Sequence, residues 1–491
     1  MTCEVAIFGF TLRPIPYTYL VPDNLAVQPG QLVEVPFGRR KSRGMVISTS
    51  SSSESIFDLK PFTRILSAQP ILSTIQLQLA RWISQTYFSP LAEAIELFLP
   101  RIPKVIPPVN SSQDQELILF PTIDQAISAH NSYPSIIYGA HLPTQEFDQS
   151  WQQIHSDAAK AIVGTRSALF APFCNLKKIT IFQTESDLYK DERRPYYRTL
   201  AVAKQLATLC GAELKAISYS PRIQDQYLIN HEIKKITHHF SYQVTDLKKT
   251  PIIGSALLDT LKKTPSSART LIFLNRKSDH GSLTCQTCKQ VSYTNDPSLC
   301  PNCGSSQVKF KIINLSTLSK KITDQIGPGA TFSTQQIFFQ SPEKNRFDII
   351  VVLSSDTYLH HNSFNAGEKT FQMITNLIRL LSPQGKIIIQ TSFPYHPSIQ
   401  LALQTNYKDF YHHELNARRE ASYPPFTNLA KLTYRDPKSE QPPDPPRLPI
   451  NIEVLGPFDG KNPYFVARGQ DLKALESLTR PWVLDIDPLS I

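Results

Sequence analysis

The chain has 491 residues, enough for roughly three domains. Hydrophobic residues make up 41% and charged residues 19%, a balance that supports packed cores and excludes a disordered tail, a collagen and a coiled coil. The net charge is +10, no apolar run approaches the ~18 residues of a membrane span, and residues 1–4 lack the basic start of a signal peptide. We therefore expect no membrane partner.

The first 104 residues predict a β-rich domain followed by helix. Short β-branched or aromatic runs at 5–8, 17–21, 32–36 and 44–47 are separated by turn residues, which is typical of strands. Residues 74–99 carry apolar side chains at helical spacing. A proline-rich stretch at 103–108 then predicts a stiff linker and a domain boundary.

The middle of the chain predicts two α/β lobes with parallel sheets. In the first, residues 105–265, apolar strands alternate with helical patterns near 145–158 and 198–210. The second, residues 266–416, repeats this alternation around a cysteine-rich insertion at 283–305. Residues 417–491 are expected to form a small α+β domain. The predicted class is therefore an α/β multidomain protein with a β-rich domain at its N-terminus.

Most of the positive charge lies in one fifth of the chain. The segment from Lys177 to Lys277 holds 18 Lys and Arg against 9 Asp and Glu, a net charge of +9. A polyanion such as DNA or RNA binds such a surface with release of counterions. A solvated basic face without a nucleic-acid partner is the alternative, and charge alone does not separate the two.

Four of the seven cysteines form two closely spaced pairs. They are Cys285 with Cys288, and Cys300 with Cys303, separated by an interval of 11 residues. Two such knuckles can place four thiolates tetrahedrally around one Zn²⁺ at about 2.3 Å. No further ligand or open position is visible, so we predict one structural zinc. A metal-free loop or a redox-active cysteine pair is the alternative.

Several strings, taken in order, resemble the replication-restart helicase family known as primosomal protein N′, or PriA. They include Tyr-Leu-Val-Pro at 19–22, Val-Pro-Phe-Gly at 35–38, Gly-Thr-Arg-Ser at 164–167, Thr-Phe-Gln at 370–372, Tyr-Pro-Pro-Phe at 423–426 and Asp-Ile-Asp-Pro-Leu-Ser at 485–490. Such strings cover nearly the whole chain. The resemblance implies two helicase lobes related to those of superfamily 2 DNA helicases.

Three parts of the family's ATP-dependent machinery do not match. The phosphate-loop pattern G-x-x-x-x-G-K-[ST] does not occur in the sequence. Gln183 and Thr184 stand where the family has its first two acidic residues, which leaves only Glu185. Arg379 is one position away from a family arginine. We therefore predict degenerate lobes, no catalytic or nucleotide-binding residues, and a pseudoenzyme rather than an enzyme.

The resemblance also implies a pocket for the 3′ end of a nascent DNA strand in the N-terminal domain. The family's aromatic, glycine and lysine match Tyr17, Gly38 and Lys60, which can stack on a base, admit a sugar and neutralise a phosphate. Thr18 stands where an aspartate is often found. Alternatively, these are a core aromatic, a turn glycine and a solvated cation. The residues expected to contact phosphates beside the glycine are Arg39, Arg40 and Lys41.

The resulting hypothesis is a replication-restart protein that binds stalled forks or branched DNA and assembles the primosome without helicase activity. The resemblance implies as partners DNA, single-strand-binding protein and proteins that load the replicative helicase, in a bacterial cytoplasm and nucleoid. The family's zinc region has eight cysteines in two sites, so one zinc is expected here, and which site is retained stays open. An active 3′→5′ helicase and a zinc-stabilised single-strand-binding protein are the alternatives.

Overall fold

The computed structural model divides into two compact units, Met1–Glu232 with Arg419–Ile491, and Ile233–Arg418. The described residues are 1–9, 16–23, 25–51, 59–100, 113–156, 159–275, 281–289, 291–294, 298–300, 302–312, 315–340, 345–360, 363–435, 444–458, 463–478 and 482–489. The predicted linker at 103–108 lies outside them.

The N-terminal strands form a five-stranded sheet that curls around its own core. The sheet has the order β2-β1-β4-β3-β5, with β1 Thr2–Ile7, β2 Tyr17–Leu20, β3 Leu32–Phe37, β4 Arg40–Ser50 and β5 Arg64–Ile65. Pro61 pairs with Leu20 on β2, and the following residues pair with β3. The segment 60–65 therefore joins the two edges of the sheet, which leaves few unpaired backbone groups.

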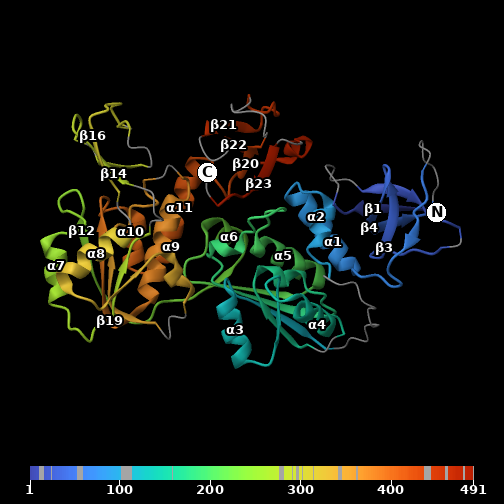
Figure 1. The fold of residues 1–491 in the computed structure, drawn as a ribbon, viewed down its shortest axis with the longest axis horizontal. Coiled ribbons are helices and arrows are strands. Elements are labelled where there is room, and N and C mark those ends of the chain that lie inside the picture. Colours follow the sequence, from blue (N-terminus) through green and yellow to red (C-terminus); the bar gives the residue numbers. More distant parts are fainter. Residues whose placement is uncertain are drawn as a thin grey trace. The chain divides into compact units, whose positions relative to one another are not determined.

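Two helices connect this sheet to the rest of the first unit (Figure 1). Helix α1, Thr74–Thr86, begins with a capping box formed by Ser73 and Gln76, and α2 spans Leu91–Glu96. The sequence predicted one helical stretch at 74–99. The structure ends the first helix at Thr86 and starts the second after Pro90, with Phe88 at φ +48° between them. The buried faces of both helices belong to one apolar core that continues into the first α/β module.

The first α/β module has a six-stranded sheet in the order β11-β10-β9-β6-β8-β7. Its strands are β6 Gln115–Leu119, β7 Ile136–Tyr138, β8 Ala161–Gly164, β9 Leu176–Phe182, β10 Glu213–Ser218 and β11 His231–Ile233, and its helices are α3 Ile123–Ser132, α4 Thr144–His155, α5 Thr199–Cys210 and α6 Ile223–Leu228. The strands from β7 to β10 pair in parallel, as predicted.

The second unit contains a parallel sheet in the order β12-β19-β18-β13-β17. Its strands are β12 Ser241–Asp246, β13 Thr270–Phe273, β17 Ala330–Ser333, β18 Phe347–Val352 and β19 Leu381–Thr391, with helices α7 Ser255–Lys262, α8 Leu315–Ile326, α9 Ala366–Arg379, α10 Pro397–Leu403 and α11 Tyr407–Glu420. A three-stranded antiparallel sheet of β14 Gly281–Cys285, β15 Val291–Thr294 and β16 Val308–Ile312 is inserted after β13. β14 and β16 project from the helix-flanked sheet (Figure 1).

The boundary between the two α/β modules differs from the predicted one at 265. β12 pairs with β19 along its whole length, from Ser241 opposite Lys386 to Asp246 opposite Thr391. Leu257 and Leu261 of α7 pack in the core of the same unit. Both elements therefore belong to the second unit, which begins at Ile233. The prediction of an α/β multidomain fold with parallel sheets is confirmed.

The C-terminal residues add a small antiparallel sheet to the first unit. It has the order β21-β22-β20-β23, with β20 Asn428–Tyr434, β21 Glu453–Phe458, β22 Tyr464–Gly469 and β23 Trp482–Ile486. Asp487, just after β23, accepts two hydrogen bonds from Arg222, at 3.0 and 3.2 Å, and lies 2.7 Å from Arg198 Nε. Among the described residues, no helix is long and apolar enough to span a membrane.

We predict that this ion cluster stabilises the first unit. Burial alone raises the pKa of Asp487, but the charges of Arg198 and Arg222 outweigh it and hold the pKa well below its usual value. Asp487→Asn should lower the free energy of unfolding by about 2–3 kcal/mol, less than for a fully buried pair because the side chain is 20% exposed. Denaturant titration measures the loss.

The pH dependence follows from the direction of that shift. The pKa of Asp487 is lower in the folded state than in the unfolded state. The stabilisation by its ion pairs is therefore complete above the unfolded-state pKa of about 4 and declines as the pH falls below that value. The difference between wild type and Asp487→Asn should shrink over the same range. Asp471→Asn, an exposed aspartate in the same C-terminal module, is the control and should change little. Equal midpoints for wild type and Asp487→Asn would contradict the assignment.

Candidate functional site

The four paired cysteines lie together at the end of the inserted sheet that is farther from its connections to β13 and α8. Cys285 ends β14, opposite Val308 on β16, and all four sulfur atoms lie within 4.8 Å of one another. Cys285 Sγ is 3.6 Å from Cys303 Sγ, and Cys288 Sγ is 3.7 Å from Cys300 Sγ. These distances are far longer than the ~2.05 Å of a disulfide bond.

The spacing of the sulfur atoms fits a tetrahedral metal site. A tetrahedron with metal–sulfur bonds of about 2.3 Å has edges of about 3.8 Å, close to both measured separations. Cys285 and Cys300 are buried with Leu283 in a small apolar cluster. The four thiols could therefore hold a metal ion such as zinc, and the described residues contain no other comparable group of potential ligands.

Backbone groups around the cysteines favour the thiolate form that a metal requires. The N–H of Cys288 donates to Cys285 Sγ at 3.4 Å, and this bond, together with the N–H of Thr287 and the neighbouring thiols, lowers the pKa of Cys285 to about 6. The N–H of Ser305 lowers the pKa of Cys303, but burial and the neighbouring thiols outweigh it and raise that pKa to about 12, so without a metal the thiolate form is favoured at Cys285. Gly304 has φ +69°, and its N–H donates to the carbonyl of Cys300 at 2.8 Å. The left-handed glycine lets the chain turn back at the second knuckle.

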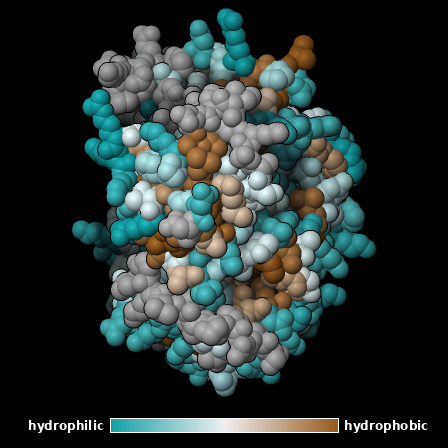
Figure 2. Space-filling view, turned by 90° about the vertical axis from the view of Figure 1, so that its right-hand side faces the viewer, coloured by the Kyte–Doolittle hydropathy of each residue, from teal (hydrophilic) through white to brown (hydrophobic). Residues whose placement is uncertain are grey.

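A second group of predicted residues lies on the N-terminal sheet. Figure 2 views the molecule from the side on which Figure 1 draws this sheet, and hydrophilic side chains surround hydrophobic patches there. Tyr17 begins β2, and its ring meets Phe37 edge to face at a centroid distance of 5.2 Å. Tyr19 donates a hydrogen bond to the carbonyl of Pro36 at 3.0 Å. The curl of the sheet thus brings the start of β2 against the end of β3.

The turn after Phe37 carries the predicted glycine and cations. Gly38 and Arg39 form a two-residue hairpin turn between Phe37 and Arg40, with φ +58° at Gly38. A Cβ atom built on Gly38 would meet nothing within 4 Å, so the space above the turn is open. The exposed cations on and beside the turn are Arg39, Arg40, Lys41 and Arg43.

Lys60 and Thr18 are both exposed on the strands that close the sheet. The carbonyl of Lys60 accepts a hydrogen bond from the N–H of Leu20 at 3.0 Å, which fixes its backbone beside β2. Lys41 forms an ion pair with Glu34 at 3.4 Å. Within the described part of the chain, no acidic side chain forms an ion pair with Arg39, Arg40, Arg43 or Lys60.

Sequence reasoning missed Phe37 and Arg64. Phe37 packs against the predicted aromatic Tyr17, and Arg64 shares Glu34 with Lys41, at 3.3 Å. Phe37 was part of the string Val-Pro-Phe-Gly, so its place next to the glycine was a usable signal. No signal could have placed Arg64, because it reaches Glu34 only through the pairing of β5 with β3.

The positions compared with the helicase acidic motif follow β9 in the first α/β module. Glu185 is buried and accepts a hydrogen bond from Ser218 Oγ at 2.5 Å, while Gln183 Oε1 accepts from Gln125 Nε2 at 3.3 Å. The central strand β6 leads into α3 through residues 120–122, Phe-Pro-Thr. Arg379 ends α9 and donates to Asn376 Oδ1 at 2.9 Å. Glu185 and Arg379 belong to different units.

Comparison with known proteins identifies the N-terminal region. The family model described as 3′DNA-binding domain (3′BD) matches residues 10–100. The replication restart protein PriA of Bacillus subtilis is 27% identical over 69% of this chain and 51% of its own length. That of Treponema pallidum is 20% identical over 87% of each chain. The chain spans about half the length of the Bacillus relative.

A solved structure of the helicase MrfA bound to DNA also matches, with a TM-score of 0.31 and 10% identity over 70% of this chain and 51% of its own. The relatives contradict the prediction that the chain is not an enzyme, because they are PriA proteins, the family named above for its helicase activity. The prediction gave decisive weight to three altered motifs, yet both parallel sheets that the resemblance implies are present. The domain match and the curated relatives make this chain similar to PriA replication restart proteins, in its N-terminal region and over most of its length.

Proposed function

We propose that the chain acts in replication restart by binding stalled forks and branched DNA, and that its N-terminal sheet holds the 3′ end of a nascent strand. The single observation that carries this proposal is the match of residues 10–100 to a 3′DNA-binding domain. The chain provides a turn with open space above it and exposed cations around it in this region. The phosphates of a DNA end need positive charge, and its terminal nucleotide needs open space.

The proposed end-binding site divides the contacts among three residues. Tyr17 stacks on the terminal base, Gly38 lets the sugar approach the backbone, and Lys60 neutralises the last phosphate. The backbone of Lys60 is hydrogen-bonded to Leu20 on β2, the strand that begins with Tyr17, which supports a shared role for the two residues. Thr18 offers a hydroxyl to the 3′-hydroxyl, a weaker partner than a carboxylate.

The neighbouring cations bind the DNA backbone. Arg39, Arg40 and Arg43 make no ion pair within the described structure, so their charges are available to phosphates. Lys41 is paired with Glu34 and contributes less. Exposed cations of the basic segment from Lys177 to Lys277 add to this interaction, because counterion release needs charge but no particular sequence. Lys190, Arg198 and Arg222 do not take part, since they are buried in ion pairs with aspartates near the C-terminus.

One Zn²⁺ per chain completes the inserted sheet. Cys285, Cys288, Cys300 and Cys303 hold the ion, which ties β14 to the loop before β16 in place of a larger core. By relation to the family, the assembled protein then recruits single-strand-binding protein and the proteins that load the replicative helicase.

We predict that Lys60→Ala weakens binding to forks that carry a 3′-hydroxyl by ~1–2 kcal/mol, the size of a partly exposed charge-assisted hydrogen bond. Forks without that end should lose much less, because the other backbone contacts remain. Fluorescence anisotropy with the two forks measures the difference, and Lys473→Ala, an exposed lysine in the C-terminal module, is the control. Equal losses on both forks would show that Lys60 is an ordinary phosphate contact.

A substitution at the glycine tests the same site without the loss of a charge. Gly38→Asn keeps the left-handed backbone, which asparagine tolerates, but puts a side chain into the open space above the turn. It should therefore reduce 3′-end discrimination while binding to forks without the end is preserved. Full discrimination by this variant would exclude the turn from the end-binding site.

We predict a steep dependence of fork binding on salt. With about six phosphates contacted, log K should fall with log salt at a slope of about −5. Replacing Arg39 and Arg40 by alanine should make the slope shallower by about 2, whereas Lys41→Ala, whose charge is already paired, should change it less. Salt titrations of the three proteins measure the slopes, and a flat response of the wild type would exclude backbone contacts as the main interaction.

We predict one Zn²⁺ per purified chain by elemental analysis. Cys300→Ser should release the metal and loosen the inserted sheet, while the two parallel sheets stay folded because their cores do not include the cysteines. Cys210→Ser, on α5, is the control and should keep the metal. Two ions per chain, or none, would refute the assignment.

A further inference from the structure

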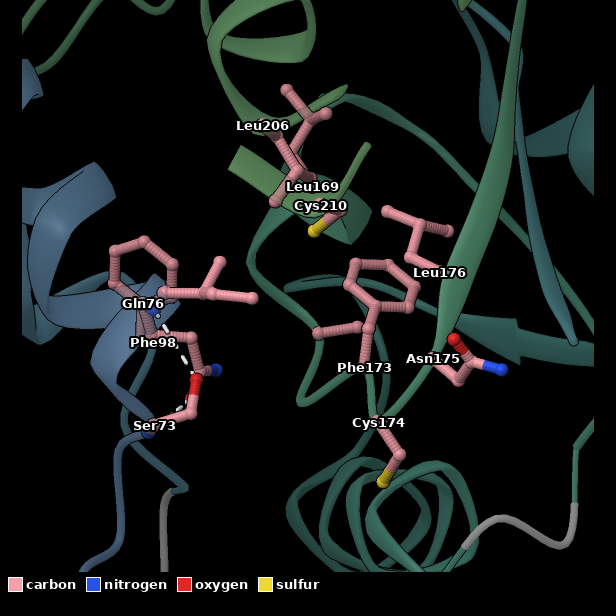
Figure 3. Close-up of a pocket in the computed structure, with 12 residues that line it drawn as sticks. Ser73, Gln76, Phe98, Leu169, Phe173, Cys174, Asn175, Leu176, Leu206 and Cys210 are labelled. Atoms are coloured by element: carbon pink, nitrogen blue, oxygen red, sulfur yellow. Dashed lines mark hydrogen bonds between the residues drawn. The ribbon is translucent and has the colours of Figure 1, made fainter. Parts of the chain in front are cut away.

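The first unit contains a cavity of about 110 Å³ between α1 and the first α/β module. Its walls come from α1, the end of the α2 region, the loop before β9, and α5 (Figure 3). Most lining groups are apolar, and the ones that define its shape are Ile75, Phe98, Phe173, Leu176, Leu206 and Cys210. None of the residues assigned to DNA or metal above lines it.

One polar group in this cavity has no partner. Gln76, on α1, is 7% exposed, and its Nε2 atom forms no hydrogen bond within the structure described. Its Oε1 atom accepts from the N–H of Ser73 at 2.9 Å in the capping box, as drawn in Figure 3. An N–H donor can pair only with the oxygen of the amide, so the capping box fixes the orientation and leaves the NH₂ group for the cavity.

The other polar side chains of the cavity wall have partners. Ser73 Oγ accepts from the N–H of Gln76 at 3.3 Å, Cys174 Sγ donates to the carbonyl of His155 at 3.0 Å, and Asn175 Nδ2 donates to Asp114 Oδ1 at 3.0 Å. A stably bound water needs two to four polar partners, and Gln76 Nε2 is the one buried side-chain atom of this wall that has none in the described structure. A buried donor without a partner costs about 1–3 kcal/mol, so an occupant that supplies an acceptor is favoured.

We propose that this cavity binds a small neutral group that joins an aliphatic body to a carbonyl oxygen, with the oxygen accepting from Gln76 Nε2. The volume is below the ~150 Å³ of an apolar cavity that takes up benzene, so about four or five carbon atoms fit. A free ketone or amide of this size has this chemistry, and so does a leucine side chain with its peptide carbonyl. The proposal does not depend on DNA binding.

Ligand-observed NMR with two isosteric probes tests the chemistry. Cyclopentanone and methylenecyclopentane have the same shape, but only the first offers an acceptor. The full-length protein should bind the ketone about three- to tenfold more tightly, the effect of one neutral hydrogen bond. Equal binding of the two probes, or binding of neither, overturns the proposal.

Three variants assign the binding to this cavity. Gln76→Glu keeps an oxygen for the Ser73 N–H but removes the donor, so the preference for the ketone should disappear. Cys210→Leu fills the space from α5 without touching the capping box and should abolish binding of both probes. Thr208→Val, an exposed position on the same helix, should bind as the wild type does. Undiminished ketone binding by Cys210→Leu would overturn the proposal even if Gln76→Glu failed to fold.

A third probe distinguishes the two possible sources of this chemistry, a free small molecule and a leucine residue of a peptide. Acetyl-leucine methylamide carries the aliphatic group and carbonyl as part of a peptide. Displacement of cyclopentanone by this compound, lost in Cys210→Leu, assigns the cavity to a leucine-like residue of a peptide. Retention of cyclopentanone in its presence assigns the cavity to a free small molecule.

Discussion

One continuous apolar core joins the N-terminal sheet to the first α/β module, and the rest of the first unit depends on it. Phe98 meets Phe170 edge to face at 5.0 Å, and Phe170 meets Tyr197 at 5.1 Å. All three side chains are almost completely buried. Burial of a large side chain contributes about 1.5–3 kcal/mol, so these contacts offset part of the entropic cost of ordering α1 and α2. The N-terminal sheet is therefore a fixed part of the unit.

The proposed end-binding site is supported by a separate apolar cluster inside the N-terminal sheet, against which Tyr17 and Phe37 both pack. The curled sheet places Tyr17 against Phe37, so the ring proposed to stack on a base is held by a second aromatic ring. The hairpin at Gly38 leaves its cations at the surface, where they remain hydrated until DNA displaces their counterions. The site thus combines a rigid apolar support with exposed charge.

Local sequence patterns were sufficient to predict the first four strands and the cysteine cluster. Short β-branched or aromatic runs located β1 to β4, and the spacing of Cys285, Cys288, Cys300 and Cys303 predicted four sulfurs that the structure brings together. These features depend on residues close in the chain. The prediction that the chain is not an enzyme also used local evidence, the three altered motifs. Similarity to a family of enzymes is judged over the whole chain and its relatives, and these contradict the prediction.

Contacts between distant residues could not be predicted in this way. The pairing of β12 with β19 joins segments that are far apart in sequence, so the module boundary was placed too late. The same holds for Arg222 and Asp487, which form an ion pair across most of the first unit's sequence. Gln76 was unremarkable in the sequence because its free amide group becomes visible only once the capping box and the facing wall are known.

The central claim is that a DNA 3′ end lies on the N-terminal sheet, and photo-crosslinking tests it most directly. A fork with 4-thiothymidine as its 3′-terminal nucleotide would be irradiated with the full-length protein, and the attached peptide identified by mass spectrometry. The account predicts crosslinks within Tyr17–Leu20 or at the turn that follows Phe37, with loss of these crosslinks when the 3′-hydroxyl is replaced by phosphate. Crosslinks confined to the second unit would contradict it.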